Sequence, residues 1–224
     1  MINRLRNTRS FYISYLCLFG LSVIFYFYQS HGDFVIWLNS LHNPIWDFFF
    51  KYWTYTGSVY FFIAVILLLI FLKRRYGIIL SMVGIGVGLV SSFFKFVVFP
   101  DTPRPSLFFE GQEILAKVEG VYMLDLNSFP SGHAMAAFAL ATFIALMLQN
   151  TSYSLLLLTL ACLTALSRVY LAQHFLIDIM AGSLLGIIIA TAYYIGFEKY
   201  LNNEVISKIN TPDEDLDKMN LDEK

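Results

Sequence analysis

Charged side chains are scarce in this sequence. They make up 14% of its 224 residues, whereas hydrophobic residues make up 58%, and the mean hydropathy is +0.64. A soluble domain of this length needs more charge to cover its surface. The composition therefore argues against an ordinary soluble fold and indicates that lipid is the main solvent.

Excess positive charge and cysteine are also lacking. The formal net charge is −1, whereas a nucleic-acid binder draws its affinity from a basic surface, so we expect no nucleic-acid partner. The two cysteines, Cys17 and Cys162, lie inside apolar runs and have no C-x-x-C spacing. This pattern is typical of small buried residues and disfavours a disulfide or a metal site.

Long apolar runs, by contrast, are abundant. A helix needs about 20 residues to cross a hydrocarbon core of about 30 Å, and six segments reach or approach that length. They are residues 11–28, 54–72, 76–99, 132–149, 153–171 and 175–197. We therefore predict an all-α fold, an integral membrane bundle of six transmembrane helices that forms a single domain over residues 1–200. Residues 201–224 are predicted to be a polar, acidic, disordered cytoplasmic tail.

The basic residues predict the orientation of this bundle. One cluster precedes the first segment and another lies between the second and third: Arg4, Arg6, Arg9, Lys73, Arg74 and Arg75. If each segment crosses once, both clusters lie on the same side, which the positive-inside rule makes cytoplasmic. Residues 29–53, 100–131 and 172–174 then lie outside. We predict a multi-pass protein of a bacterial inner (cytoplasmic) membrane, with these loops on the periplasmic side.

Two of the outer stretches are predicted to lie in the membrane interface. Residues 34–50 mix Trp, Phe and polar residues around Pro44. Residues 107–122 place apolar side chains at near-helical spacing with charged residues between them. This second pattern predicts an amphipathic interfacial helix in the outer loop.

Three groups of polar residues interrupt the apolar chain. They comprise Lys95 and Arg104; Pro130, Ser131, Gly132 and His133; and Ser167, Arg168, His174 and Asp178. In the topology derived from charge alone, all three groups fall at the outer face. This coincidence was not imposed, and it is the strongest indication of a functional site.

The cations in these groups suit a phosphate ligand. Lys95, Arg104 and Arg168 lie near the membrane boundary, where an ionised side chain is costly unless it has a partner or lines a wet cavity. A phosphate is such a partner, and two guanidinium groups can hold its oxygens bidentately. Ser131 and Gly132 stand at the start of a predicted helix, whose free N–H groups can bind an anion. Because glycine has no side chain, Gly132 lets the anion approach the backbone closely.

The histidines suit phosphoryl transfer. His174 and Asp178 are four residues apart, which places them on one helix face. A carboxylate that accepts the Nδ1 proton leaves Nε2 unprotonated as a nucleophile, and His133 could protonate the leaving oxygen from the other side of the phosphorus. Singly, these residues have structural explanations, such as a snorkelling lysine or a helix cap. Their joint occurrence at one face favours a site.

These motifs resemble the signature of the type 2 phosphatidic acid phosphatase family, which is related to vanadium haloperoxidases and glucose-6-phosphatase. The motif Pro-Ser-Gly-His is complete at residues 130–133, and Ser-Arg-x5-His-x3-Asp is complete at residues 167–178. The remaining motif, Lys-x6-Arg-Pro, differs here because eight residues separate Lys95 from Arg104. The resemblance covers roughly residues 54–197.

The resemblance implies a role for each matching residue. His174 attacks phosphorus and forms a phosphohistidine, Asp178 orients it, and His133 protonates the leaving group. The phosphate oxygens are held by Lys95, Arg104, Ser131, Gly132 and Arg168. Water then hydrolyses the intermediate without a divalent metal or a cofactor, which agrees with the lack of a carboxylate cluster suited to Mg²⁺.

The leading functional prediction is a membrane phosphatase acting on a lipid phosphate or diphosphate at the outer leaflet. Candidate substrates are phosphatidylglycerol phosphate, phosphatidic acid, undecaprenyl diphosphate and a lipid A phosphate group. A lipid-to-lipid phosphotransferase on the same scaffold is the alternative, because only the geometry of the acceptor differs. An anion or lipid transporter is disfavoured, since it does not explain His133 together with the His174–Asp178 pair. Membrane lipids are the expected partners, and the sequence identifies no protein partner.

Overall fold

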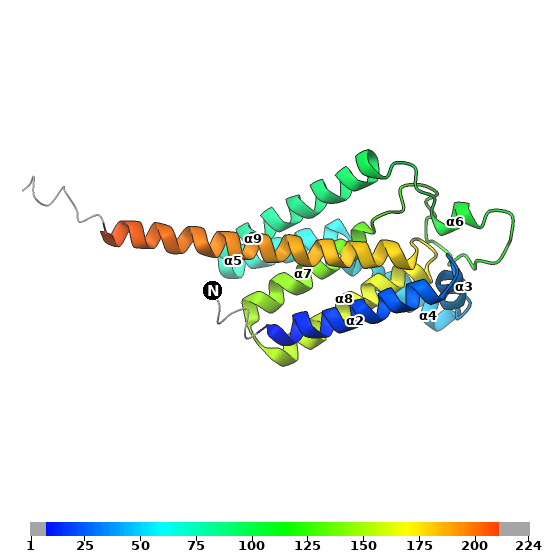
Figure 1. Ribbon diagram of the computed structural model, residues 1–224, viewed down its shortest axis with the longest axis horizontal. Helices are drawn as coiled ribbons and strands as arrows, with labels where there is room; N and C mark the ends of the chain where they lie inside the picture. Colours follow the sequence, from blue (N-terminus) through cyan, green and yellow to red (C-terminus); the bar gives the residue numbers. More distant parts are fainter. Residues whose placement is uncertain (1–7, 211–224) are drawn as a thin grey trace, which may run out of the picture.

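The computed structural model describes residues 8–210, and the side chains of residues 8–197. Every regular element in this range is helical. The elements are α2 (Arg9–Tyr28), α3 (Asp33–Asn39), α4 (Pro44–Trp53), η1 (Thr54–Gly57), α5 (Val59–Phe93), η2 (Phe94–Val98), α6 (Pro105–Phe108), α7 (Gly132–Leu148), α8 (Thr151–Tyr170) and α9 (Leu176–Asn210). The long helices form an elongated bundle, and α3, α4 and α6 gather at one end of it (Figure 1).

The element α5 consists of two arms that run in opposite directions. Its backbone leaves the helical conformation at Lys73, where φ is −149° and ψ is 71°, and the chain reverses there (Figure 1). The arms pack together through Gly84, because a Cβ atom added at Gly84 would lie 3.0 Å from Cε1 of Phe62. The arms therefore correspond to the second and third apolar segments of the sequence.

The apolar helices indicate a multi-pass membrane protein. Within the described residues, four helical stretches are long and apolar enough to span a membrane: Arg9–Tyr28, Val59–Val98, Thr151–Tyr170 and Leu176–Phe197. The helix α7 is apolar but shorter. Six crossings would result if α7 and both arms of α5 each crossed the membrane, and that count stays a prediction.

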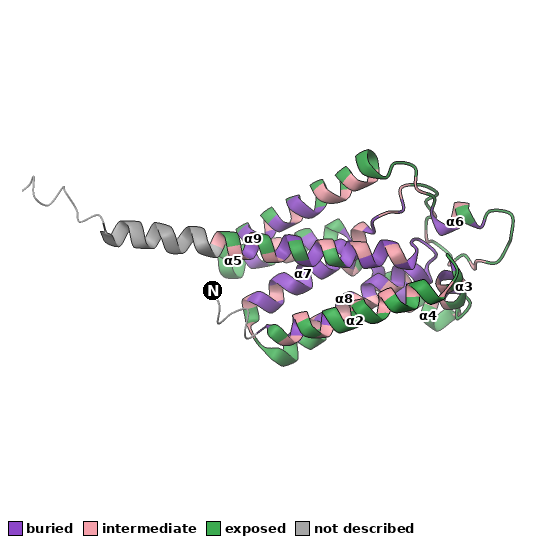
Figure 2. Ribbon diagram, viewed as in Figure 1, coloured by how far each residue is buried: buried purple, intermediate pink, exposed green. Residues whose placement is uncertain are grey.

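The outside of the bundle carries large apolar side chains. Phe27 on α2 and Phe71 on the first arm of α5 are 80% and 87% exposed, and Figure 2 shows exposed positions along both of these outer helices. So many exposed aromatic and aliphatic groups would be unfavourable in water. They are suited to contact with lipid chains, which supports the membrane assignment.

The helix α7 lies at the centre and is buried along most of its length (Figure 2). It meets α9 almost backbone to backbone at Gly182 and Gly186. A Cβ atom at Gly182 would collide with the carbonyl oxygen of Ser131, and one at Gly186 would collide with that of Met135. Small residues at such spacing let membrane helices approach closely. This contact fixes the start of α7 against the first turns of α9.

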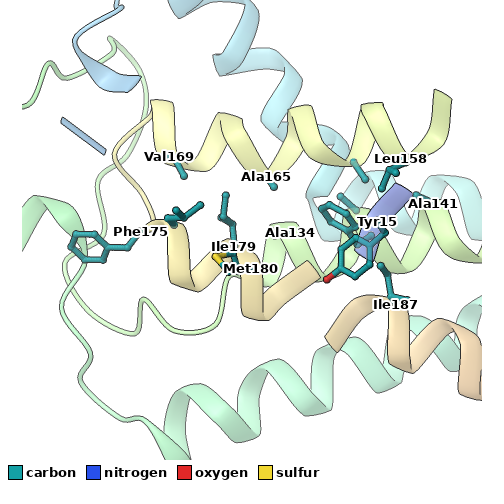
Figure 3. Close-up of a cluster of buried hydrophobic side chains, with 14 of the residues drawn as sticks. Tyr15, Ala134, Ala141, Leu158, Ala165, Val169, Phe175, Ile179, Met180 and Ile187 are labelled. Carbon is teal, nitrogen blue, oxygen red and sulfur yellow. The ribbon is translucent and has the colours of Figure 1, made fainter. Parts of the chain in front are cut away.

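A hydrophobic cluster between α7, α8 and α9 supports this arrangement (Figure 3). Ala165 and Val169 of α8 face Ile179 and Met180 of α9, and Ala134 of α7 lies beside them. The cluster reaches the ends of these helices that carry the polar motifs. The elements that hold the motifs are therefore anchored by buried packing.

Two predictions about the polar segments were wrong. The predicted interfacial helix over residues 107–122 ends at Phe108, because α6 is a single turn followed by irregular chain. Gly111, Glu113 and Gly120 have φ values of 80°, 53° and 72°, which a right-handed helix cannot contain. At the other end, α9 continues through Asn210, since no glycine or proline occurs between residues 197 and 210, so part of the predicted tail is helical. Residues 211–224 lie outside the described residues.

Candidate active site

The predicted site residues gather at one end of the bundle. This is the end where α7 and α9 begin and where α8 ends, whereas the reversal between the two arms of α5 lies at the opposite end (Figure 1). Each residue therefore stands in a terminal turn or in a connecting loop. Chain segments that are distant in the sequence meet here, as the topology derived from charge predicts.

His174 and Asp178 lie at the start of α9. The distance from His174 Nδ1 to Asp178 Oδ2 is 3.4 Å, and each residue is only 2% exposed. The backbone N–H of Phe175 donates to the same carboxylate oxygen at 2.9 Å. Backbone N–H groups at a helix start stabilise a carboxylate. Asp178 is thereby fixed, and it faces one nitrogen of the imidazole.

The other imidazole nitrogen faces Arg104. The distance from Nη1 of Arg104 to Nε2 of His174 is 3.4 Å. The guanidinium also donates to two backbone carbonyl oxygens, from Nε to Leu126 at 2.9 Å and from Nη1 to Gln173 at 3.0 Å. Arg104 is thus held beside the predicted nucleophile by neutral dipoles, so its positive charge remains available to an anion.

Lys95 reaches the same region despite its longer spacing from Arg104. Lys95 Nζ donates to the carbonyl oxygen of Asn127 at 2.5 Å, and Arg104 Nη2 donates to that same oxygen at 3.4 Å. Lys95 lies in η2, a π-helix, which takes more residues per turn than an α-helix. The π-helix and the following loop accommodate the two additional residues, so the departure from the family motif does not separate these cations.

Arg168 lies in the last turn of α8, and its side chain contacts two residues outside the predicted motifs. Its Nη1 donates to Thr54 Oγ1 at 2.7 Å, and its Nη2 donates to Gln173 Oε1 at 3.4 Å. Arg104 Nη1 lies 3.5 Å from the same Gln173 oxygen, so Gln173 bridges the two guanidinium groups. Arg168 Nε is buried without a hydrogen-bond partner. Such a donor is costly when unpaired, and an anion in the site would satisfy it.

The start of α7 forms another wall of the site. The backbone N–H of Ser131 donates to the Asp178 carbonyl oxygen at 3.0 Å, and Ser131 Oγ caps the helix by accepting from the Ala134 N–H at 3.4 Å. The N–H groups of the first turn, which begins at Gly132, therefore lie beside the cations. His133 follows in the same turn and is half-buried.

An apolar groove of about 570 Å³ lies next to this turn. Both arms of α5 contribute to its wall, Phe62 and Ile66 from the first and Ile85 and Gly88 from the second. Gly132 and His133 at the start of α7 also line the groove. His133, which is predicted to protonate the leaving group, therefore borders a groove with apolar walls.

The electrostatic environment keeps His174 neutral. Burial lowers the pKa of His174 well below its usual value of 6.5, and the positive charges of Arg104, Arg168 and Lys95 lower it further. Burial also lowers the pKa of Arg104, while the carboxylate of Asp178 acts in the opposite direction. At neutral pH the His174 imidazole therefore carries a lone pair, which a nucleophile requires.

Three further residues contact the predicted site residues, and the sequence analysis did not identify them. Ser128 donates to Asp178, Gln173 bridges the two arginines, and Thr54 accepts from Arg168. Ser128 and Gln173 stand close to motif residues in the sequence, and that proximity is the only signal that could have identified them. Thr54 is 114 positions from its partner, so nothing in the sequence links the two.

Comparisons with known proteins agree with this architecture. The model of the PAP2 superfamily matches residues 75–201, which include every predicted site residue. The lipid A 4'-phosphatase of Porphyromonas gingivalis is 28% identical over 181 residues, covering 75% of this chain and 73% of that protein.

Two solved structures share the fold. The crystal structure of Aquifex aeolicus LpxE has a TM-score of 0.64 at 24% identity, covering 73% of this chain and 94% of that one. The crystal structure of the first transmembrane PAP2 type phosphatidylglycerolphosphate phosphatase from Bacillus subtilis has a TM-score of 0.62 at 21% identity, with coverage of 86% and 96%. These likenesses establish the helical arrangement of the chain.

Proposed function

The chain belongs to the PAP2 superfamily, and from that premise we propose that it is a phosphatase that hydrolyses a lipid phosphate or diphosphate at the outer leaflet. The observation that carries this proposal is the apolar groove whose wall includes His133, beside a buried cluster of cations. The name of the Porphyromonas gingivalis relative makes a lipid A phosphate the first substrate to test. Phosphatidylglycerol phosphate, phosphatidic acid and undecaprenyl diphosphate complete the set of candidates.

In the first half of the proposed reaction, His174 becomes phosphorylated. The lone pair of Nε2 forms a bond to phosphorus while the bond from phosphorus to the lipid oxygen breaks. His133 transfers a proton to that oxygen, and the lipid alcohol departs. The imidazole of His174 now carries a positive charge, and its Nδ1–H faces the carboxylate of Asp178, 3.4 Å away.

In the second half, water hydrolyses the phosphohistidine. The water oxygen bonds to phosphorus, its proton passes to His133, and the electron pair of the breaking N–P bond returns to Nε2 of His174. The charge that develops on the phosphate oxygens is stabilised by Lys95, Arg104 and Arg168 and by the N–H groups at the start of α7. These cations are held in place before the substrate arrives, so little reorganisation is needed.

The groove supports a lipid over a soluble phosphate ester. It lies between the arms of α5, which belong to an apolar stretch suited to span a membrane. A lipid whose chain occupies the groove would place the oxygen of its phosphate ester beside His133, the group that is proposed to protonate that oxygen. The chain of a lipid can enter such a groove from the bilayer and remain among apolar groups, whereas a soluble ester has no chain to occupy the groove.

A variant that fills the groove tests this proposal. A Cβ atom at Gly88 would meet no atom within 4 Å, so a side chain can start there without strain, and Gly88→Leu adds bulk to the groove. We expect kcat/KM for a long-chain lipid phosphate to fall about tenfold or more, while hydrolysis of nitrophenyl phosphate stays unchanged. Release of inorganic phosphate from each purified candidate lipid in detergent measures the activity.

The matched control for this variant is Gly20→Leu. Gly20 also lies in open space but on α2, which does not line the groove, so this change should affect neither substrate. Equal losses on both substrates with Gly88→Leu would contradict a lipid site in the groove. Transfer of phosphate to a second lipid, without release of inorganic phosphate, would identify a phosphotransferase instead.

We also propose that the reaction needs no divalent metal, because three cationic side chains supply the charge that a metal would provide. Among the described residues, no three His, Cys, Asp or Glu side chains are grouped so that they could hold a metal ion. Phosphate release should therefore be unchanged in excess EDTA. Loss of activity on chelation, restored by Mg²⁺, would mean that the role of the cations is misassigned.

The site is further proposed to face the periplasm of a bacterial inner membrane, because the reversal between the arms of α5, where the sequence has its basic cluster, lies at the opposite end of the bundle. In a background in which both native cysteines are replaced by alanine, Tyr122→Cys should react with an impermeant maleimide on intact spheroplasts. Tyr122 is 83% exposed in the outer loop. Arg74→Cys should react only after permeabilisation, and the reverse pattern would place the site in the cytoplasm.

A further inference from the structure

A third side chain meets the His174–Asp178 pair. Ser128, in the loop before α7, donates its hydroxyl proton to Asp178 Oδ2 at 2.5 Å. The same hydroxyl oxygen lies 3.4 Å from Nδ1 of His174. Ser128 is 1% exposed, so water does not compete for these contacts. The proposed reaction, as described so far, assigns this residue no role.

The number of available protons determines how the three groups pair. An ionised carboxylate can only accept, so the single hydroxyl proton of Ser128 points to Asp178 and leaves the serine oxygen as an acceptor. Asp178 Oδ2 and Ser128 Oγ both lie 3.4 Å from His174 Nδ1. A proton on Nδ1 therefore has two side-chain acceptors, whereas a lone pair on Nδ1 would face the oxygen atoms of these two side chains. The arrangement favours the tautomer whose Nε2 is unprotonated.

The position of Ser128 is fixed by a segment outside α9. Its backbone N–H donates to the carbonyl oxygen of Thr102 at 3.1 Å, and the N–H of Phe129 donates to Thr102 Oγ1 at 3.2 Å. The chain that leads to Arg104 thus holds the serine loop in place. The hydroxyl group consequently restrains the imidazole from a different direction than Asp178 does.

We propose that Ser128 is a positioning residue for phosphoryl transfer, which together with Asp178 fixes the orientation and tautomer of His174. This inference rests on the proposed function. When the His174 Nε2–phosphorus bond forms and the bond to the lipid oxygen breaks, the imidazole gains a positive charge and keeps its Nδ1–H. Ser128 Oγ and Asp178 Oδ2 are the acceptors that stabilise this proton in the phosphohistidine.

Three variants test the role of the hydroxyl group. Ser128→Ala should lower kcat for nitrophenyl phosphate about 10- to 100-fold, because one partner of a buried charged hydrogen bond is lost, with KM unchanged. Ser128→Thr keeps a hydroxyl group and should retain most of the activity. Ser154→Ala is the matched control. Ser154 is fully buried at the start of α8, whereas the site lies where α8 ends, and its hydroxyl donates to the Asn150 carbonyl oxygen. It should leave kcat unchanged.

Two further measurements separate positioning from a purely structural role. In a double-mutant cycle, Ser128→Ala should cause little further loss in the Asp178→Asn background, because both residues act through His174. Inorganic phosphate, titrated by calorimetry, should bind Ser128→Ala as it binds the wild type. If the loss of kcat is fully additive with Asp178→Asn, or if phosphate binding weakens in parallel, Ser128 only anchors the loop and the inference is wrong.

A readout without turnover keeps this inference distinct from the proposed function. In protein labelled with ¹⁵N-histidine, the shifts of the His174 resonances should report a single tautomer in the wild type and a mixture in Ser128→Ala. Unchanged shifts would overturn the positioning role. A wild-type protein that shows this tautomer but hydrolyses neither lipid nor aryl phosphate would contradict the proposed function alone.

Discussion

His174→Ala is expected to abolish hydrolysis of every phosphate ester. The proposed intermediate is a covalent bond to Nε2, the imidazole nitrogen that lies 3.4 Å from Nη1 of Arg104. Loss of a catalytic nucleophile should therefore reduce kcat by about 10⁴-fold or more, whatever the leaving group. The measurement is release of inorganic phosphate from a lipid phosphate and from nitrophenyl phosphate, with purified variants of equal thermal stability.

His133→Ala should behave differently, and the contrast identifies the two roles. Loss of a general acid should reduce hydrolysis of a lipid phosphate by about 10²–10⁴-fold. Nitrophenolate leaves without a proton, so the variant should regain much of its activity on the aryl substrate. Asp178→Asn should lie between the two histidine variants, because the imidazole remains but its tautomer is less controlled. If His174→Ala were rescued by the aryl substrate and His133→Ala were not, the roles would have to be exchanged.

Arg168→Lys is expected to have the next largest effect, although it conserves the charge. The guanidinium reaches Thr54 and Gln173 with separate nitrogens and has a third, buried Nε without a partner. A lysine ammonium cannot make these contacts and also bind a phosphate oxygen. We expect kcat to fall about 10²–10³-fold, the usual cost of losing one preorganised donor to a transition-state oxyanion.

The control for this substitution is Arg75→Lys, at the opposite end of the bundle, where Arg75 lies over the Phe197 ring. This variant should hydrolyse phosphate esters at the wild-type rate. Near wild-type kcat in Arg168→Lys, together with unchanged affinity for inorganic phosphate, would show that charge alone suffices and that the guanidinium geometry is not used.

The contact between His174 and Asp178 could be predicted from the sequence because their spacing is local. The four-residue separation of His174 and Asp178 places them on one helix face, and the structure holds them in contact. The alternation of basic clusters and apolar runs was enough to bring distant motifs to one end of the bundle. Contacts such as that of Thr54 with Arg168 could not be predicted, since they depend on how helices pack.

The errors also have physical causes. The apolar spacing over residues 107–122 is typical of a helix. That spacing does not reveal the positive φ values at Gly111 and Glu113, which a helix over these residues could not contain. The close approach of α7 and α9 depends on Gly182 and Gly186, whose role becomes visible only when a neighbouring backbone is present. Hydrophobic pattern thus located the helices, whereas backbone conformation and close packing determined the loop and the helix contact.

The way in which the cations are held has a consequence for regulation by product. Lys95 and Arg104 are bound by carbonyl oxygens, which are dipoles and leave the positive charge uncompensated, and Asp178 is engaged with His174. A site with this charge therefore attracts an anion as a counter-ion. Inorganic phosphate, the last species to leave, is that anion. With the proposed function and orientation, turnover should slow as phosphate accumulates outside the cell, which would couple the rate of lipid dephosphorylation to the phosphate supply of the environment.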